Sequence, residues 1–244
     1  MNVRTGSRAG GPLYVWNGWF ADIGQFRLLM MAALDQAFAN ADPSVRLDAA
    51  LRAGMSPYLE QLDTLLNQCV VEPDFQVREM LTWALIRLPP EVVVPKLIGE
   101  LSRKEPQARS QALHTLSKFR DPSAWEAVAE MLNDEDQRVM RTAWYASVAL
   151  VPDERRKWLA EKLATRLGIG DKETQLSLSR ALAGLGPEPA MAVLKPAIQS
   201  SDADVREHAS ATERLMSDPD AGFAVSLKAA RKQVALGRTR SSKG

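Results

Sequence analysis

Apolar and polar positions recur along this chain with a fixed period. Six times, an acidic residue stands three positions before a small or apolar anchor, Arg usually follows the anchor directly, and an apolar residue comes four positions after it. The anchors are Val45, Val77, Ala108, Val139, Thr174 and Val205, at intervals of 32, 31, 31, 35 and 31 residues. Such self-similarity predicts units that bury their apolar faces only by stacking on their neighbours, which is a solenoid.

The third unit shows the expected elements most clearly. Glu105-Pro106 fits a helix start, because Pro costs nothing at an early helical position. The stripe that follows has helical spacing and consists of Ala108, Ala112, Leu113 and Leu116. Asp121-Pro122 begins a second helix of the same kind. We therefore expect an all-α fold, a curved α-solenoid of about six helical hairpins with about twelve or thirteen helices. The 35-residue interval predicts the longest turn within 162–171.

One form of the repeat carries a resemblance to a known family. The run Asp42-Pro43-Ser44-Val45-Arg46, with Ala49 after it, resembles the second-helix signature of HEAT repeats, especially the bacterial subtype named after phycobilisome lyases. The run 202–206 is similar, whereas Met140 and Gln175 depart from it at the Arg position and Thr174 at the anchor. The resemblance implies an armadillo-like superhelix of six HEAT-like units whose second helices line a concave surface.

The recurring acids and arginines are interpreted as a structural ladder. An acid at a helix start caps backbone N–H groups and offsets the helix dipole, and the Arg can bridge to a neighbouring unit. The ladder consists of Asp42, Arg46, Asp74, Arg78, Glu105, Arg109, Asp202 and Arg206. A chemical role for these residues is the weaker alternative. The acids Asp134, Glu135 and Asp136 are expected to be solvated at a turn.

A second row, six residues after each anchor, is predicted to face outward, because a helix turns about 100° per residue. The row holds Leu51, Trp83, His114, Tyr145, Arg180 and Ala211. Trp, Tyr and Arg are enriched at binding hot spots, so the candidate partner-binding row is Trp83, His114, Tyr145 and Arg180. The alternative is that Trp83 and Tyr145 wedge between adjacent helices. The other tryptophans of the body, Trp125, Trp144 and Trp158, are expected to fill the core or the space between helices.

Composition and charge divide the chain into three parts. Hydrophobic residues make up 45% and charged residues 25%, as in a folded protein, and no stretch is apolar enough to span a membrane. The net charge of +1 combines +2 over 1–29, −7 over 30–225 and +6 over 226–244. The acidic body argues against nucleic acid as its partner. We expect a partly disordered extension at 1–29, the HEAT-like solenoid at 30–234 and a basic disordered tail at 235–244.

The N-terminal extension has no counterpart in the repeats. Its glycines and Pro12 disfavour a helix before about Trp19. We expect residues 1 to about 12 to be disordered and 19–40 to be helical. A chain that starts at Met30 should still fold, with somewhat lower stability, because terminal units need caps.

Signals of catalysis are weak. His114 and His208 lie three units apart, and Cys69 has no His or Cys at metal-ligand spacing, so we expect no metal. The runs 168–170 and 184–187 fit helix stops rather than a phosphate loop, so we expect no cofactor and no catalytic residues. A single cysteine excludes an internal disulfide and fits a reducing, cytoplasmic compartment.

Three classes of function remain open. The favoured one is a non-enzymatic scaffold that binds a protein partner on its concave surface. The alternatives are a HEAT-like DNA glycosylase or other nucleic-acid-binding protein, and a chromophore-lyase-like accessory protein. The acidic body opposes the glycosylase, which needs a basic channel for DNA. The oligomeric state stays open.

Overall fold

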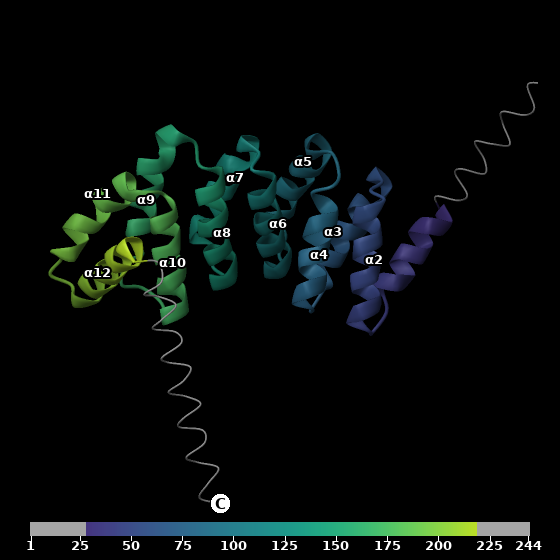
Figure 1. Cartoon of the computed structure of the whole chain (residues 1–244), viewed down its shortest axis with the longest axis horizontal. Coiled ribbons are helices and arrows are strands. Elements are labelled where there is room, and N and C mark those ends of the chain that lie inside the picture. The colour runs from purple at the N-terminus through teal and green to yellow at the C-terminus, as the bar shows by residue number, and fades with distance from the viewer. Residues whose placement is uncertain (1–27, 219–244) are drawn as a thin grey trace, which may run out of the picture. The chain divides into compact units, whose positions relative to one another are not determined.

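The computed structural model describes residues 28–218 (Figure 1), and their regular structure is helical throughout. The chain forms two compact units. The first holds the residues up to Gln68 together with Glu72–Arg87, and the second holds Cys69–Val71 and the residues from Leu88 onward. The expectation of an all-α solenoid built of helical hairpins is confirmed. The expectations for 1–12, for 19–27 and for the basic tail lie outside the described residues.

The first unit begins with a helix over 28–38, two residues shorter at its end than predicted. The helices after it are α2 (Pro43–Met55), α3 (Leu62–Val71), whose last three residues group with the second unit, and α4 (Phe75–Leu85). The 3-10 turn η1 (Leu59–Gln61) leads into α3. Helix α2 packs against α4, and fully buried Ala50 and Leu81 belong to the core of this unit.

The second unit holds eight of the helices. They are α5 (Pro90–Glu100), α6 (Pro106–Phe119), α7 (Trp125–Glu130), α8 (Gln137–Leu150), α9 (Arg156–Ala164), α10 (Lys172–Gly184), α11 (Pro187–Ile198) and α12 (Ala203–Ser217). Helix α6 packs on α8, α8 on α10 and α10 on α12, while α5, α7, α9 and α11 each pack on the even-numbered helix that follows. The short 3-10 turns η2 (Pro122–Ala124), η3 (Met131–Asn133) and η4 (Asp153–Arg155) flank α7 and precede α9.

The predicted register of the repeat is confirmed. Each of the six acidic positions is the N-cap of one even-numbered helix, from Asp42 at α2 to Asp202 at α12. The four inner anchors, Val77, Ala108, Val139 and Thr174, are at most 2% exposed. Val45, in the first of these helices, is 38% exposed. The apolar stripe of each inner repeat therefore faces its neighbours, as the period requires.

The longest turn between described elements lies where the longest interval predicts it. It runs from residue 165 to the cap Asp171, between α9 and α10. Gly168 and Gly170 adopt φ angles of 79° and 90°, which L side chains rarely adopt. A Cβ atom on Gly168 would also lie 2.9 Å from the backbone nitrogen of Val205 in α12. The two glycines therefore allow the turn to close against the last hairpin.

The tryptophans expected to fill the core occupy the second unit. Trp144 is 1% exposed, and its Nε1–H donates to the Leu132 carbonyl at 3.0 Å. Trp125 is 4% exposed and meets half-buried Trp158 edge to face, with ring centroids 6.0 Å apart. This edge-to-face pair joins α7 to α9, because an indole edge is attracted to the face of another ring.

Candidate functional site

The outward row divides into buried and exposed members. Tyr145 is 55% exposed and Leu51 is 37% exposed, and Arg180 and Ala211 are exposed as well. Trp83 and His114 are half-buried. The predicted outward orientation of the row is therefore right for α8 and α10. At Trp83, the packing around the ring is different.

Trp83 packs into a gap in the first unit that a glycine leaves open. A Cβ atom on Gly54 of α2 would overlap the six-membered ring of Trp83 and would come within 3.1 Å of Ala84 Cα. On its other side, Arg87 Cζ lies 5.4 Å from the ring centroid. The contact with Gly54 is the wedge between adjacent helices that the sequence left open as an alternative. It assigns the Trp83 ring mainly to packing between α2 and α4.

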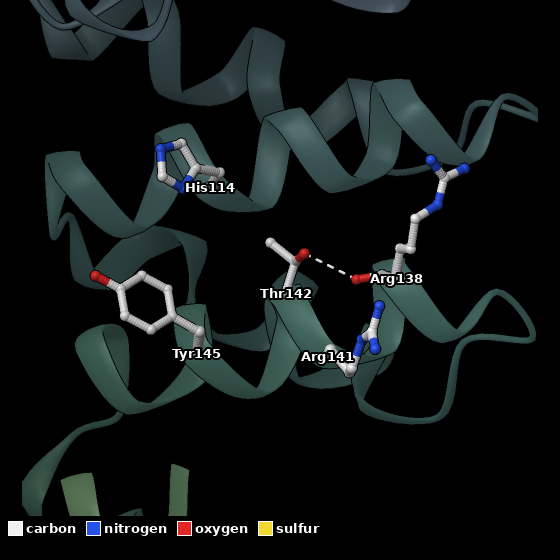
Figure 2. A pocket seen from close by; sticks show the side chains of 5 residues that line it. All are labelled: His114, Arg138, Arg141, Thr142 and Tyr145. Carbon is white, nitrogen blue, oxygen red and sulfur yellow. Dashed lines mark hydrogen bonds between the residues drawn. The ribbon is translucent and has the colours of Figure 1, made fainter. Parts of the chain in front are cut away.

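Tyr145 instead borders an open hollow on the second unit. The hollow has a volume of about 370 Å³ and is lined by His114 of α6 and by Arg138, Arg141, Thr142 and Tyr145 of α8 (Figure 2). Lys118 Nζ lies 5.7 Å from the centroid of the Tyr145 ring, within range of a cation–π interaction. An aromatic ring, an imidazole and several cationic groups thus lie close together on this surface.

Hydroxyl groups join α6 to α8 at Thr142, one of the residues that line the hollow. Ser110 Oγ and Thr142 Oγ1 lie 2.9 Å apart, and Thr142 Oγ1 donates to the Arg138 carbonyl at 2.8 Å. Ala112 of α6 and Ala143 of α8 are at most 2% exposed. Such small buried residues allow two packed helices to approach closely.

A third helix extends this surface. Arg141 Nη1 lies 3.0 Å from Glu173 Oε2 of α10, and the two side chains are 18% and 74% exposed. Arg138 is 64% exposed, with Nε 3.8 Å from the cap carboxylate of Asp136. We call this surface the α6–α8–α10 face and define it by His114, Lys118, Arg138, Arg141, Thr142, Tyr145, Glu173 and Arg180.

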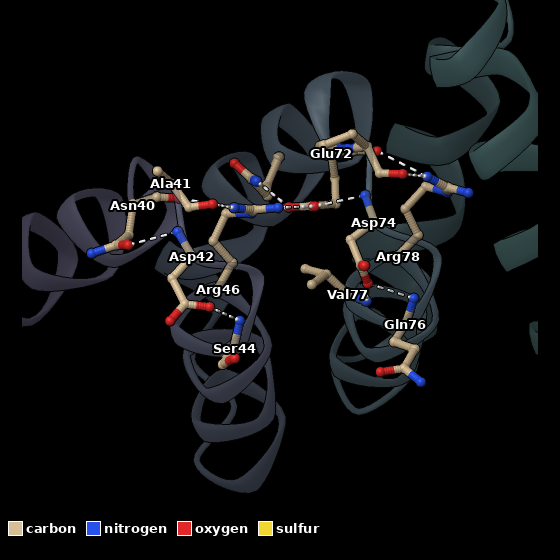
Figure 3. A network of polar contacts seen from close by, with 12 residues as sticks. Asn40, Ala41, Asp42, Ser44, Arg46, Glu72, Asp74, Gln76, Val77 and Arg78 are labelled. Atoms are coloured by element: carbon tan, nitrogen blue, oxygen red, sulfur yellow. Dashed lines mark hydrogen bonds and ion pairs between the residues drawn. The ribbon is translucent and has the colours of Figure 1, made fainter.

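The ladder residues hold neighbouring repeats together. In the first unit, Arg46 Nε and Nη2 each donate to Glu72 at 2.8 Å, and Arg46 Nη1 donates to the carbonyls of Asn40 and Ala41 (Figure 3). Glu72 also accepts from Gln68 Nε2 at 2.7 Å and from the Asp74 N–H at 2.9 Å. The Arg–Glu fork thus links α2 directly to the cap of α4.

The same arrangement recurs in the second unit. Arg109 Nε and Nη2 donate to Asp134 at 3.0 and 2.9 Å, and Nη1 donates to the carbonyls of Arg103 and Lys104. Asp134 accepts from the N–H of Asp136, the cap of α8, at 2.9 Å. The expectation that Asp134 is a solvated turn acid is wrong, because its side chain is 8% exposed and held by Arg109. We call each such Arg–carboxylate–cap arrangement a clamp.

The other ladder residues make only part of this pattern. Arg78 Nη1 donates to the carbonyls of Glu72 and Pro73, and Arg206 Nη1 donates to those of Ser200 and Ser201. The caps of α2, α4 and α12 accept backbone N–H groups through their carboxylates. Glu105 stands at the cap of α6 without such a bond, because Glu is one methylene longer than the preferred capping residues.

Hydrogen bonding and burial shift the pKa values of these carboxyl groups. The hydrogen bond from the Ser44 N–H lowers the pKa of the Asp42 carboxyl. Burial acts to raise the pKa of Glu72, but the hydrogen bonds from Arg46, the Asp74 N–H and Gln68 outweigh it and lower that pKa below its ordinary value. Both groups are therefore held as carboxylates, which suits a structural role.

The sequence did not indicate a third polar cluster, around His208 of α12. The Gly168 N–H donates to His208 Nδ1 at 3.0 Å, so Nδ1 is the acceptor and Nε2, 2.9 Å from the Gln175 carbonyl, carries the proton. Ser179 Oγ lies 3.1 Å from His208 Nε2 and 2.8 Å from Thr212 Oγ1. Burial lowers the pKa of the His208 imidazole, although the Gln175 carbonyl acts in the opposite direction. The cluster ties α12 to α10.

Among residues 28–218, no group of three or more His, Cys, Asp or Glu side chains is placed to hold a metal ion. Within the same range, no helix combines the length and the apolar character needed to cross a membrane.

Comparison with known proteins bears on residues 62–149, which match the family model described as HEAT repeats. Three similar solved structures are crystal structures of engineered proteins. The first is 19% identical with a TM-score of 0.46, and the match covers 76% of this chain and 98% of that one. The second is 20% identical with a TM-score of 0.42, and its shares are 77% and 96%. The third is also 20% identical, with a TM-score of 0.40 and shares of 77% and 58%. No curated protein matches the chain.

Proposed function

We propose that this chain is a non-enzymatic scaffold that binds a protein partner on the α6–α8–α10 face. One observation carries the proposal. Tyr145, an aromatic residue of the predicted row, is 55% exposed beside a hollow lined by two arginines and a histidine. Tyr and Arg are the residue types that dominate binding energy at protein interfaces. HEAT repeats, which match 62–149, are typically scaffolds for protein interaction.

The face has the construction that a binding surface needs. Its side chains project from helices whose backbones are fixed by buried stripes and, at α6 and α8, by the Arg109–Asp134 clamp. A rigid base lowers the entropic cost of binding, because only the outward side chains have to be ordered. The HEAT resemblance implies that this row lies on a concave side, and the single cysteine is compatible with a reducing cytoplasm.

The nucleic-acid alternative has weaker support. The four cations of the face, Lys118, Arg138, Arg141 and Arg180, favour it. Against it, Glu173 lies among them in an ion pair with Arg141, and residues 30–225 carry a net charge of −7. A surface that follows a phosphate backbone needs a continuous basic stripe. The chromophore-lyase-like alternative rests on the resemblance of the repeat alone.

A co-purification experiment tests the proposal. The intact chain is compared with the double variant Tyr145→Ala/Arg180→Gln and with the control Lys157→Gln/Lys195→Gln, whose exposed charges lie on α9 and α11. All three samples are treated with nuclease. We expect the intact chain and the control to enrich the same proteins and the face variant to lose them. Equal enrichment by all three chains, or enrichment that nuclease abolishes, would contradict the proposal.

A further inference from the structure

The α6–α8–α10 face is positive on a chain whose body is acidic. Lys118, Arg138, Arg141 and Arg180 project from three neighbouring helices. Glu173 forms an ion pair with Arg141, and the cap carboxylate of Asp171 also attracts it. The cap carboxylate of Asp136 lies 3.8 Å from Arg138 Nε. A local excess of one charge on a surface of the opposite net sign attracts a complementary partner and excludes others.

The two side chains of the Arg141–Glu173 ion pair differ in their exposure to solvent. Arg141 is 18% exposed and lies against the hollow, whereas Glu173 is 74% exposed on the outer side of α10. An ion pair with a solvated carboxylate contributes little to stability, so exchanging that carboxylate for another costs little. A planar guanidinium suits any carboxylate that approaches in its plane.

We propose, building on the proposed function, that the face binds a short acidic segment of the partner protein, one of whose carboxylates replaces Glu173 on Arg141. The Tyr145 ring offers the adjoining apolar contact, and Lys118, Arg138 and Arg180 receive further carboxylates. Two helix spacings of about 8 to 10 Å separate α6 from α10. That span of about 16 to 20 Å matches about five or six residues of extended chain.

Fluorescein-labelled hexaglutamate is the probe, titrated with the intact chain at about 50 mM salt and followed by anisotropy, because screening weakens such contacts at higher salt. Arg141→Gln should raise Kd about tenfold. Arg138→Gln, at a more exposed position, should raise it about threefold without affecting the fold. The control Lys157→Gln removes one exposed charge from α9 and should change Kd less than twofold. Equal losses in all three variants would overturn the proposal.

Replacement of Glu173 has a sharper test. Glu173→Gln should tighten hexaglutamate binding about threefold, because Arg141 loses its ion-pair partner and keeps only the electrostatic attraction of the cap carboxylate of Asp171. The control Glu161→Gln removes one exposed negative charge from α9 without contact to Arg141. Tightening that is equal in both variants, or a loss of thermal stability in Glu173→Gln without tighter binding, would show that Glu173 is not displaced.

Two further measurements separate this inference from the proposed function. A single-stranded oligothymidine of six nucleotides that binds more tightly than hexaglutamate would overturn the acidic protein segment in favour of nucleic acid. A protein partner captured through the face but not released by excess hexaglutamate would overturn the inference and leave the scaffold function intact. Hexaglutamate binding with the expected variant pattern, but with no protein captured through the face, would contradict the scaffold function alone.

Discussion

Trp83 and Tyr145 occupy the same position of the repeat and have opposite environments. Trp83 in the first unit packs over Gly54, whereas Tyr145 in the second unit is 55% exposed. Gly54 stands nine residues after the anchor of the preceding repeat, and the matching position before Tyr145 is Ser117, which is 3% exposed and donates to the His114 carbonyl. Gly54 of the preceding helix therefore leaves the space into which the Trp83 ring packs, whereas the Tyr145 ring projects from its helix.

The largest expected effect is a loss of stability when the clamp between α2 and α4, the two helices that Trp83 packs between, is broken. Glu72→Gln leaves the Arg46 guanidinium, 8% exposed, without its buried carboxylate. Breaking a buried ion pair by removing one partner costs about 3 to 5 kcal/mol. Urea denaturation followed by circular dichroism measures this loss. The control Glu207→Gln, on the exposed surface of α12, should stay within about 0.5 kcal/mol. A loss as small as that of the control would mean that Glu72 does not hold α2 to α4.

The comparison itself is tested by truncating each ring. Trp83→Ala should lower the free energy of unfolding by about 2 to 3 kcal/mol, below the range for a fully buried ring because Trp83 is half-buried. Tyr145→Ala should cost less than about 1 kcal/mol, because its ring leaves no cavity. Chemical denaturation of both variants measures the difference. Equal losses would show that the two rings have the same structural role.

A smaller expected effect tests whether Gly54 is what allows the Trp83 ring to pack between α2 and α4. Gly54→Ala should cost about 1 to 3 kcal/mol, since its methyl group would overlap the Trp83 ring. In a double-mutant cycle with Trp83→Ala, most of that cost should disappear, because the clashing ring is gone. The same cycle between Ser117→Ala and Tyr145→Ala should show no coupling. Additive losses for Gly54 and Trp83 would contradict the wedge.

The smallest expected effect is a pH dependence of the free energy of unfolding. It concerns the contact between α10 and α12. Because burial lowers the pKa of His208 in the folded state, the unfolded chain binds the proton first as pH falls below about 6.5. The free energy of unfolding should therefore decrease from pH 7.5 to pH 5.5, as protonation of Nδ1 opposes the Gly168 N–H. Urea midpoints over this range measure the change. His208→Gln should flatten the profile; an unchanged profile in this variant would show that His208 does not cause the pH dependence.

The sequence predicted the fold well because the signals that set it are local. The acid three positions before each anchor marks a helix start in every one of the six cases, since capping is decided within a few residues. The turn at 165–171 followed from the one long interval. The helix starts and the long turn could both be predicted without knowing which helices contact one another.

The contacts between repeats were harder to predict because they depend on residues far apart in the chain. Arg46 meets Glu72, and Arg109 meets Asp134, at separations of 26 and 25 residues. A signal was present: both carboxylates stand two residues before the next cap, and both arginines follow an anchor. The packing of the Trp83 ring gave no such signal, because the space that it fills is left by Gly54 on the preceding helix.

The clamps have a consequence for the mechanics of the array. Buried polar contacts tie α2 to the start of α4, α6 to the start of α8, and α12 to α10. Between α8 and α10, Met140 takes the Arg position and Ile169 the carboxylate position, and the ion pair of half-buried Arg141 with exposed Glu173 bridges the two helices. Under tension, the joint between α8 and α10 should therefore open before the clamped joint between α6 and α8. The clamped pair of α6 and α8 should then move as a single rigid link.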